Sequence, residues 1–212
     1  LSNSGKITAP SSMTFVDLKF VIEDEENSAI FVEKTFKIAV DCDSSKNMIY
    51  NKVADVKFKN PDYPQENMTD NDAKTAFRVL NANTADADIV FNLEGEKVFN
   101  SVYVLNEDLT MEDYEIYSSV DGEAWHLITS GNMNGEVSKL IEFTNTTASF
   151  VKFVVKKCEA PFVHIGEMKV YFGGTDLELA EYDIENVAID VAPTGTKISL
   201  PETGANGTKF TW

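Results

Sequence analysis

The sequence predicts an all-β protein whose central part folds as an antiparallel β-sandwich. Short segments of alternating apolar and polar residues recur along the chain, and Gly, Asp, Asn and Pro turns separate them. No segment shows a convincing helical period. With 14 Phe among 212 residues, the chain is rich enough in apolar side chains to build a core. Short strands at this spacing are typical of sandwiches.

The N-terminal residues 1–42 are expected to form a linker and a β-hairpin. Small polar residues fill the first dozen positions. Met13–Ile22 and Ala29–Val40 then alternate with period two on either side of the acidic turn Glu23–Asn27. A polar segment, Asp41–Asn47, marks the boundary with the sandwich.

Residues 43–173 are expected to form the sandwich. The long loop Asn60–Thr75 contains Pro residues, which exclude a central strand. Asp121-Gly122 predicts a hairpin turn, and the strand that follows is expected to bury Trp125 in the core. About eight short strands are predicted, among them Ile89–Leu93, Ser101–Leu105, Tyr114–Ser118, Trp125–Ile128, Leu140–Phe143, Phe150–Val155 and Met168–Phe172.

Residues 174–212 are expected to add further strands. Leu177–Val191 alternates again, and Gly195–Leu200 predicts another strand. This segment resembles the opening strands of a bacterial immunoglobulin-like domain. It either belongs to a following domain or pairs with the N-terminal hairpin as a split β-unit, because an isolated hairpin is marginally stable.

The charge balance restricts the partners of the chain. Against 18 Lys and Arg stand 35 Asp and Glu, so the net charge is −17. Such a surface repels nucleic acid and anionic bilayers, and it favours a neutral ligand or a cation. No segment approaches the roughly 20 apolar residues of a membrane span, so membrane insertion is not expected.

The two cysteines leave the compartment open. Cys42 and Cys158 are too few to staple a domain of this size. They either pair, if their strands lie side by side, or remain as two buried free thiols, which is the interpretation we favour.

Two segments carry a family resemblance: Tyr114–Trp125, YEIYSSVDGEAW, and Phe150–Phe172, FVKFVVKKCEAPFVHIGEMKVYF. They resemble the "yeIy-S-DG--W" hairpin and the "yVkf-v" and "IgE-kvy" strands of discoidin, or coagulation factor V/VIII type C, domains. The resemblance covers about Asp43–Gly173. It implies a galactose-binding-domain-like jelly roll, of the kind found in bacterial carbohydrate-binding modules.

The loop before Phe77 contains a cluster of oxygen-bearing side chains. Asp70, Asp72 and Thr75 lie within six residues, and Asn71 tolerates a left-handed backbone between them. Hard cations such as Ca²⁺ bind six to eight oxygen atoms in loops of this kind. The alternative is that these residues are ordinary solvated turn formers.

The resemblance favours a structural Ca²⁺. The loop is similar to the "tDgd--T" loop of calcium-containing discoidin-type modules, in which the Glu of the "IgE" strand completes the metal site. That residue is Glu167 here, and the matching main-chain ligands are the carbonyls of Asn67 and Gly166.

The resemblance also implies a sugar site on the loops, although the usual galactose-binding residues are replaced. Phe77-Arg78 stands where relatives often carry Trp-His, and Asn106-Glu107-Asp108 stands where they carry an Arg. An aromatic face can stack on a pyranose, while Arg, Asn and His bind its hydroxyls. The candidate ligand-binding residues are Tyr63, Phe77, Arg78, Asn106, Phe162 and His164. Each of them singly can also be a core, rim or ion-pair residue.

These observations predict a non-catalytic carbohydrate-binding module. His126 and His164 are the only histidines, and no hydrolase, metalloprotease or nucleotide-binding motif occurs, so we expect no enzyme activity. The expected setting is a bacterial secreted or cell-surface protein such as a glycoside hydrolase, with a galactose- or hexosamine-containing glycan and neighbouring domains as partners. The alternative is a protein-interaction or spacer module.

Overall fold

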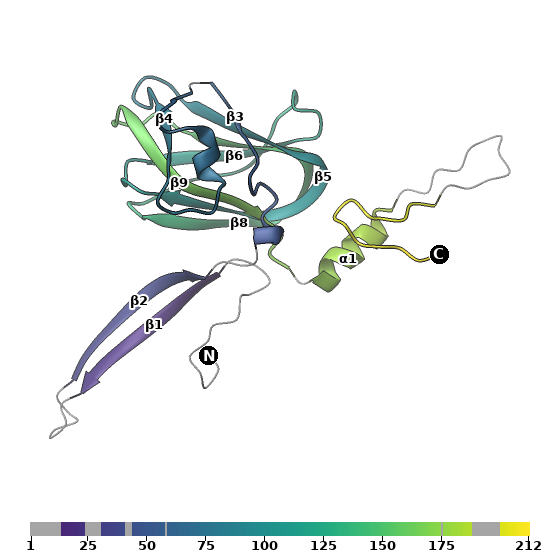
Figure 1. Cartoon of the computed structure of the whole chain (residues 1–212), viewed down its shortest axis with the longest axis horizontal. Coiled ribbons are helices and arrows are strands. Elements are labelled where there is room, and N and C mark those ends of the chain that lie inside the picture. The colour runs from purple at the N-terminus through teal and green to yellow at the C-terminus, as the bar shows by residue number, and fades with distance from the viewer. Residues whose placement is uncertain (1–13, 24–30, 41–43, 58, 175, 188–199) are drawn as a thin grey trace.

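The structure is a computed structural model that describes residues 14–23, 31–40, 44–57, 59–174, 176–187 and 200–212. Strands dominate these ranges and form a sandwich of antiparallel strands with a separate hairpin, which confirms the all-β class (Figure 1). The strands are β1 (Thr14–Glu23), β2 (Phe31–Val40), β3 (Asp55–Val56), β4 (Phe77–Leu80), β5 (Ala87–Asn106), β6 (Asp113–Ser119), β7 (His126–Asn132), β8 (Ser138–Val155) and β9 (Phe162–Tyr171). The helical elements are the 3₁₀ turns η1 (Ser44–Lys46) and η2 (Gln65–Met68) and the helix α1 (Asp176–Glu185).

Two long bent strands, β5 and β8, join the two layers of the sandwich. Residues 87–92 of β5 pair with residues 150–155 of β8, while residues 101–105 of β5 pair with residues 138–142 of β8. One layer therefore has the order β7-β6-β8-β5-β3, and the other has the order β4-β9-β5-β8. These two strands replace four of the short strands that the sequence predicts.

The bend of β5 is made by residues that accept a left-handed backbone. Glu94 has a φ of 63° and Gly95 a φ of 121°. The side-chain oxygen of Asn92 accepts a hydrogen bond from the Glu94 N–H at 2.7 Å, and this bond closes the turn. The alternating pattern on both sides of the bend predicted strands, but it contained no sign that they are continuous.

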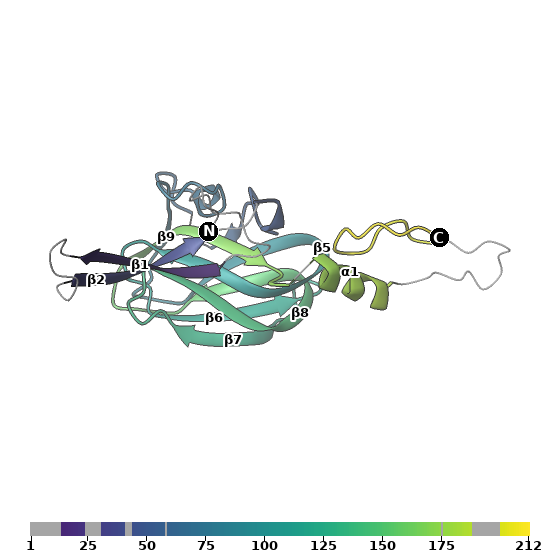
Figure 2. The same ribbon diagram turned by 90° about the horizontal axis from the view of Figure 1, so that it is seen from below.

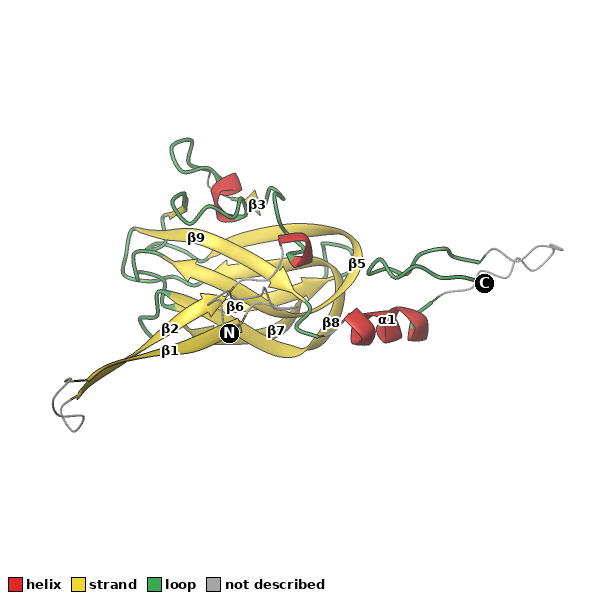
Figure 3. Cartoon of the chain, turned by 60° about the horizontal axis from the view of Figure 1, so that its bottom comes forward, coloured by secondary structure: helices red, strands yellow, loops and turns green. Residues whose placement is uncertain are grey.

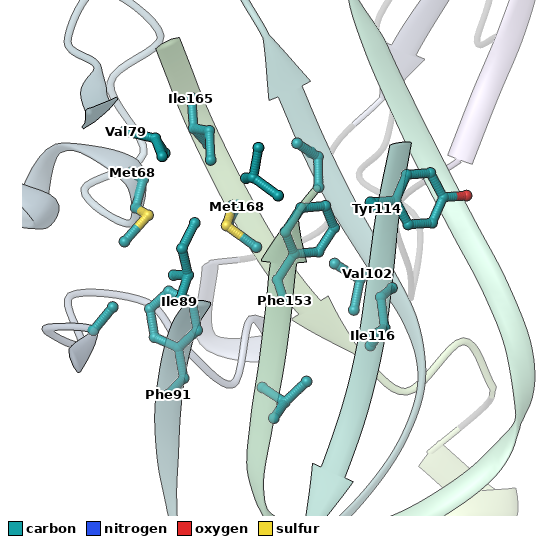
Figure 4. Close-up of a cluster of buried hydrophobic side chains, with 14 of the residues drawn as sticks. Met68, Val79, Ile89, Phe91, Val102, Tyr114, Ile116, Phe153, Ile165 and Met168 are labelled. Carbon is teal, nitrogen blue, oxygen red and sulfur yellow. The ribbon is translucent and has the colours of Figure 1, made fainter. Parts of the chain in front are cut away.

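The core fills the space between the two layers. Ile89, Phe91 and Phe153 of one layer meet Ile165 and Met168 of the other (Figure 4), and each of these five is at most 1% exposed. Period-two alternation places one side of every strand in this core, as expected for a sandwich.

The β6–β7 hairpin is confirmed. The Asp121 carboxylate accepts hydrogen bonds from the Glu123 and Ala124 N–H groups at 2.8 and 2.9 Å, and Gly122 has a φ of 79°. The assignment of Trp125 to the core is wrong. Its ring is half-exposed on the outside of the sheet, with the Lys152 Nζ 4.5 Å from the ring centroid. Trp125 lies just before β7, and the pairing of β7 with β6 shifts register between Ile116 and Tyr117.

Strands β1 and β2 form a separate antiparallel hairpin with Thr14 opposite Val40 (Figure 1), as their alternation predicts. The other segment outside the sandwich differs from the prediction. The prediction of a strand over Leu177–Val191 is wrong, because Asp176–Glu185 form the helix α1.

The helix forms because Leu, Ala and Glu are good helix formers and because Asp183 anchors it. The carboxylate of Asp183 is 2% exposed and accepts backbone hydrogen bonds from Asn206 at 3.0 Å and Thr208 at 3.1 Å. The strand expected at Gly195–Leu200 lies outside the described residues, save Leu200. The domain limits and the immunoglobulin-like continuation stay predictions.

Cys158 is buried and its thiol is free, while Cys42 lies outside the described residues. Burial raises the pKa of the Cys158 thiol above its usual range. The free-thiol interpretation therefore holds for Cys158.

Phe77 and Phe162 provide a matched test of this packing. Phe77 is 1% exposed in the core, and Phe162 is 37% exposed at the surface. Truncating a buried Phe to Ala removes its transfer energy and leaves a cavity, which costs about 3–5 kcal/mol. Urea denaturation should show a loss of this size for Phe77→Ala and a loss below about 1 kcal/mol for Phe162→Ala. Equal losses for the two variants would contradict the placement.

Candidate functional site

The pairing of β4 with β9 creates the candidate ligand site. Arg78 lies opposite His164, and Leu80 lies opposite Phe162. Since neighbouring residues of a strand point to opposite faces, Phe77 and Val79 enter the core while Arg78 points outward.

Arg78 is held between aromatic rings. Its guanidinium carbon lies 3.9 Å from the centroid of the Tyr63 ring and 4.7 Å from that of Phe162. Its Nε–H donates a hydrogen bond to the Nε2 atom of His164 at 2.7 Å. Guanidinium groups stack well on aromatic faces, so the Arg78 side chain has one preferred position. Its terminal nitrogens can still donate hydrogen bonds to a ligand.

The hydrogen bond from Arg78 sets the tautomer of His164. Since Nε2 accepts this hydrogen bond, the ring proton must lie on Nδ1. Nδ1 faces the Asp108 Oδ2 atom at 3.4 Å, an electrostatic contact without hydrogen-bond geometry. The Thr110 hydroxyl donates to the other Asp108 oxygen at 2.6 Å. Asp108 therefore orients the ring. It was not among the predicted ligand residues, although it lies two positions after Asn106 in the same loop.

Four of the six predicted ligand residues thus meet on one surface. The His164 ring lies 5.2 Å from the rings of both Tyr63 and Phe162. We call Tyr63, Arg78, Asp108, Phe162 and His164 the Arg78 patch. Within the patch, the positive charge of Arg78 offsets the negative charge of Asp108. The patch therefore suits a ligand without net charge.

The prediction that Phe77 and Asn106 contact the ligand is wrong. Phe77 belongs to the core, as described above. Asn106 is fully buried: its amide accepts a hydrogen bond from the Met111 N–H at 3.2 Å and donates to the carbonyls of Met111 and Glu136 at 3.4 Å. Its role is to close the loop after β5, because a buried backbone N–H needs a partner.

The predicted cation loop folds back over β9 (Figure 3). The hydroxyl oxygen of Thr75 lies 2.9 Å from Asp70 Oδ2, 2.9 Å from the Asp72 carbonyl and 3.4 Å from the Asn67 carbonyl. Asn71 has a φ of 63°, so the left-handed turn expected there is present. The Asp72 carboxylate itself accepts the Lys74 N–H at 3.0 Å and is directed toward the loop backbone.

Glu167 is the carboxylate beneath this loop. It is 4% exposed, and neither of its oxygens has a hydrogen-bond partner of normal geometry. Burial raises the pKa of Glu167 to about 8; the Lys169 ammonium opposes this increase and the nearby Asp70 carboxylate adds to it. An unpartnered buried carboxylate is costly, and a bound cation is one way to offset that cost.

The chemistry of these donors fits Ca²⁺ better than a transition metal. Among the residues that the structure describes, no three His, Cys, Asp or Glu side chains are grouped to hold a metal. The oxygens that do converge are two carboxylates, a hydroxyl and backbone carbonyls, which is the mixture that hard cations prefer. The carbonyl of Gly166 stays a predicted ligand.

Gly166 itself is required by close packing. A Cβ atom there would lie 2.7 Å from Leu105 Cδ2 and 2.8 Å from the Glu107 carboxylate. This close approach lets β9 continue past the end of β5, where the register shifts between Leu105 and Asn106. The shift places Glu167 on the same outer face as His164, since Ile165 and Met168 both point into the core.

Comparison with known proteins agrees with this architecture. The family model of the F5/8 type C domain matches residues 44–168, more than half of the chain. The protein therefore belongs to the F5/8 type C, or discoidin, family. No curated protein matches the sequence.

Solved structures show the same fold. CpGH89CBM32-5 from Clostridium perfringens, in complex with GalNAc-β-1,3-galactose, is 23% identical, with a TM-score of 0.50 over 56% of this chain and 93% of that chain. Chitosan-binding module 1 of a chitosanase/glucanase from Paenibacillus sp. IK-5 is 21% identical, with a TM-score of 0.54 over 59% of this chain and 98% of that one. A GH29 fucosidase of Ruminococcus gnavus, in complex with fucose, is 21% identical, with a TM-score of 0.52 over 63% and 28% of the two chains.

The raised pKa of Glu167 predicts a pH-dependent stability when no cation is bound. The folded protein holds the Glu167 proton up to about pH 8, whereas the unfolded chain releases it near 4.5. The free energy of unfolding should therefore fall as the pH rises between these values. Glu167→Gln keeps the shape without the charge, so it should flatten this dependence and raise the melting temperature at pH 8 in chelator. Asp55→Asn, at an exposed site, is the control. A Glu167→Gln profile that parallels the parent would refute the assignment.

Proposed function

We propose that this domain is a non-catalytic carbohydrate-binding module that holds a neutral sugar on the Arg78 patch. The observation that carries the proposal is the convergence of Tyr63, Arg78, Phe162 and His164 from a loop and two strands onto one surface. The solved structure of CpGH89CBM32-5 in complex with GalNAc-β-1,3-galactose is consistent with it.

The patch offers the two kinds of contact that a sugar needs. The exposed ring of Phe162 provides an apolar face for the C–H side of a pyranose. The terminal N–H groups of Arg78 provide donors for ring hydroxyls. Asp108 supports His164 from behind, because its Oδ2 atom is buried and its Oδ1 atom accepts from Thr110. A galactose- or hexosamine-type sugar has an apolar face that can pack on Phe162 and hydroxyls that can accept hydrogen bonds from Arg78.

We further propose that Asn67, Asp70, Asp72, Thr75, Gly166 and Glu167 hold a structural Ca²⁺. The unpartnered oxygens of Glu167 and the oxygens around Thr75 support this assignment. The bound ion would offset the negative charge of the buried Glu167 carboxylate. Because Tyr63 lies in the same loop and its carbonyl accepts the Arg78 N–H at 3.4 Å, fixing the loop also fixes one wall of the patch.

The proposed setting is a bacterial extracellular protein in which this domain accompanies a glycoside hydrolase or an adhesin. Among the described residues, no helix has the length and apolar character needed to cross a bilayer. A single shallow site gives weak affinity, and repeated modules on one protein strengthen attachment to a glycan.

A spacer function is the second candidate, and one observation favours it. The N–H of Val98 on β5 donates to the side-chain oxygen of Asn206 at 3.0 Å, and the Asn206 amide donates to Asp183 at 2.7 Å. These bonds hold α1 and the C-terminal segment against the sandwich. Such a link could fix the orientation of a neighbouring domain.

Calcium binding should appear as a thermal shift. A ligand that binds only the folded state stabilises it by about 2.7 kcal/mol at a concentration 100 times its Kd. Calcium should raise the melting temperature over chelator, and Asp70→Asn or Glu167→Gln should each remove the increase. Asp62→Asn, an exposed change in the same loop, should keep it. Identical melting curves in calcium and chelator for the stripped parent protein would exclude the site.

Sugar binding should depend on Phe162 and Arg78. Titration calorimetry with N-acetylgalactosamine should detect weak binding that Phe162→Ala and Arg78→Ala each weaken by about 1–3 kcal/mol, through loss of a stacking face or of a charged donor. Leu127→Ala, which trims an exposed apolar residue outside the patch, is the control and should bind like the parent. If no neutral sugar binds at millimolar concentrations while calcium still stabilises the fold, the spacer function is the better account.

A further inference from the structure

A crevice of about 520 Å³ lies at the opposite end of β9 from the Arg78 patch, between the bend of β5 and the C-terminal segment. Strand β9 begins at Phe162 in the patch and ends at Tyr171, and Phe172 lines the crevice. Ten strand residues span about 30 Å, so the two sites are separate. The volume falls within the range of small-molecule sites, which often lie where two parts of a chain meet.

The walls of the crevice are fixed by hydrogen bonds. Lys97 on β5 donates to the carbonyl of Ala205, and Val98 donates to Asn206 at 3.0 Å, so the C-terminal segment closes one side. On the other side, the Nζ of Lys52 lies 2.6 Å from the Glu94 carboxylate at the bend of β5. Walls held in this way are already arranged for a ligand, which lowers the cost of binding. Figure 2 shows α1 beside β5 at this end of the sandwich.

The charge of the lining differs from that of the whole protein. Three lysines, Lys46, Lys52 and Lys97, line the crevice, and Glu94 is its only acidic residue. The chain as a whole carries a net charge of −17. Lys52 is paired with Glu94, and the three lysines outnumber this carboxylate, so the lining itself carries more positive than negative charge.

Aromatic surface accompanies this positive charge. The side chain of Tyr50 is 39% exposed, and half-buried Phe172 also lines the crevice. Lysine ammonium groups bind carboxylate or sulfate as point charges, and an aromatic ring can pack against the C–H face of a sugar.

We propose that this crevice is a second ligand site, which takes an anionic sugar residue bearing a carboxylate or a sulfate. The site is independent of the neutral-sugar patch, so one domain could contact a glycan at two places. A glycan that carries both neutral and acidic residues would then be held by both ends of the sandwich.

The test is an NMR titration of the isotopically labelled protein with sodium glucuronate and, separately, with glucose 6-sulfate. Either probe should shift the amide resonances of Tyr50, Lys52 and Lys97 in a saturable way, and the two arms distinguish carboxylate from sulfate recognition. Neutral glucose should leave these resonances unchanged. Lys52→Gln should weaken the binding about tenfold, as expected for loss of a charged partner. Lys59→Gln, the same change at an exposed position outside the crevice, should weaken it less than twofold.

Tyr50→Ala provides a second variant if Lys52→Gln disturbs the bend of β5, and it should also weaken binding while leaving the remaining spectrum intact. Arg78→Ala should leave the crevice titration unaltered, which separates this site from the patch. Equal shifts with glucose, an equal loss for Lys59→Gln, or equal affinity for inorganic sulfate alone would overturn the proposal, as would the absence of shifts at the crevice.

Discussion

The antiparallel register between β4 and β9 is the constraint on which the candidate site depends. By setting Arg78 opposite His164, it brings a loop residue, Tyr63, and a strand end, Phe162, against one guanidinium group. A slip of one residue would exchange the two faces of β4 and place Phe77 outside and Arg78 in the core. The burial of Phe77 therefore enforces the register that builds the patch.

The same strand also connects stability with ligand chemistry. The register shift beside Asn106 turns Glu167 to the outer face, where the loop around Thr75 buries it without a hydrogen-bond partner. A hydrophobic residue there would give a more stable apo protein, since a buried carboxylate loses its hydration. Retaining Glu167 makes physical sense if a cation fills the space between it and Asp70, and the bound loop then orders one side of the patch.

The sequence predicted those features that local chemistry determines. The Asp121-Gly122 hairpin and the left-handed turn at Asn71 follow from turn residues. The family resemblance, and not alternation, placed Glu167 on the closing strand. Alternation does not say which face of a short strand is buried, so Phe77 and Trp125 were placed on the wrong sides. The burial of Asn106 depends on Met111 and on a loop thirty residues away, which no local pattern reports. In the C-terminal segment, alternating apolar residues fitted a strand, while the described structure uses the same residues in helix α1.

The most direct measurement of the central claim is a set of intermolecular nuclear Overhauser effects between N-acetylgalactosamine and the aromatic rings of the calcium-loaded protein. The account predicts contacts from the sugar ring protons to Phe162 and His164, and none to Trp125, the half-exposed tryptophan on the other layer. Contacts to Trp125 without contacts to Phe162 would contradict it, because the sugar would then bind a surface that the β4–β9 pairing does not build.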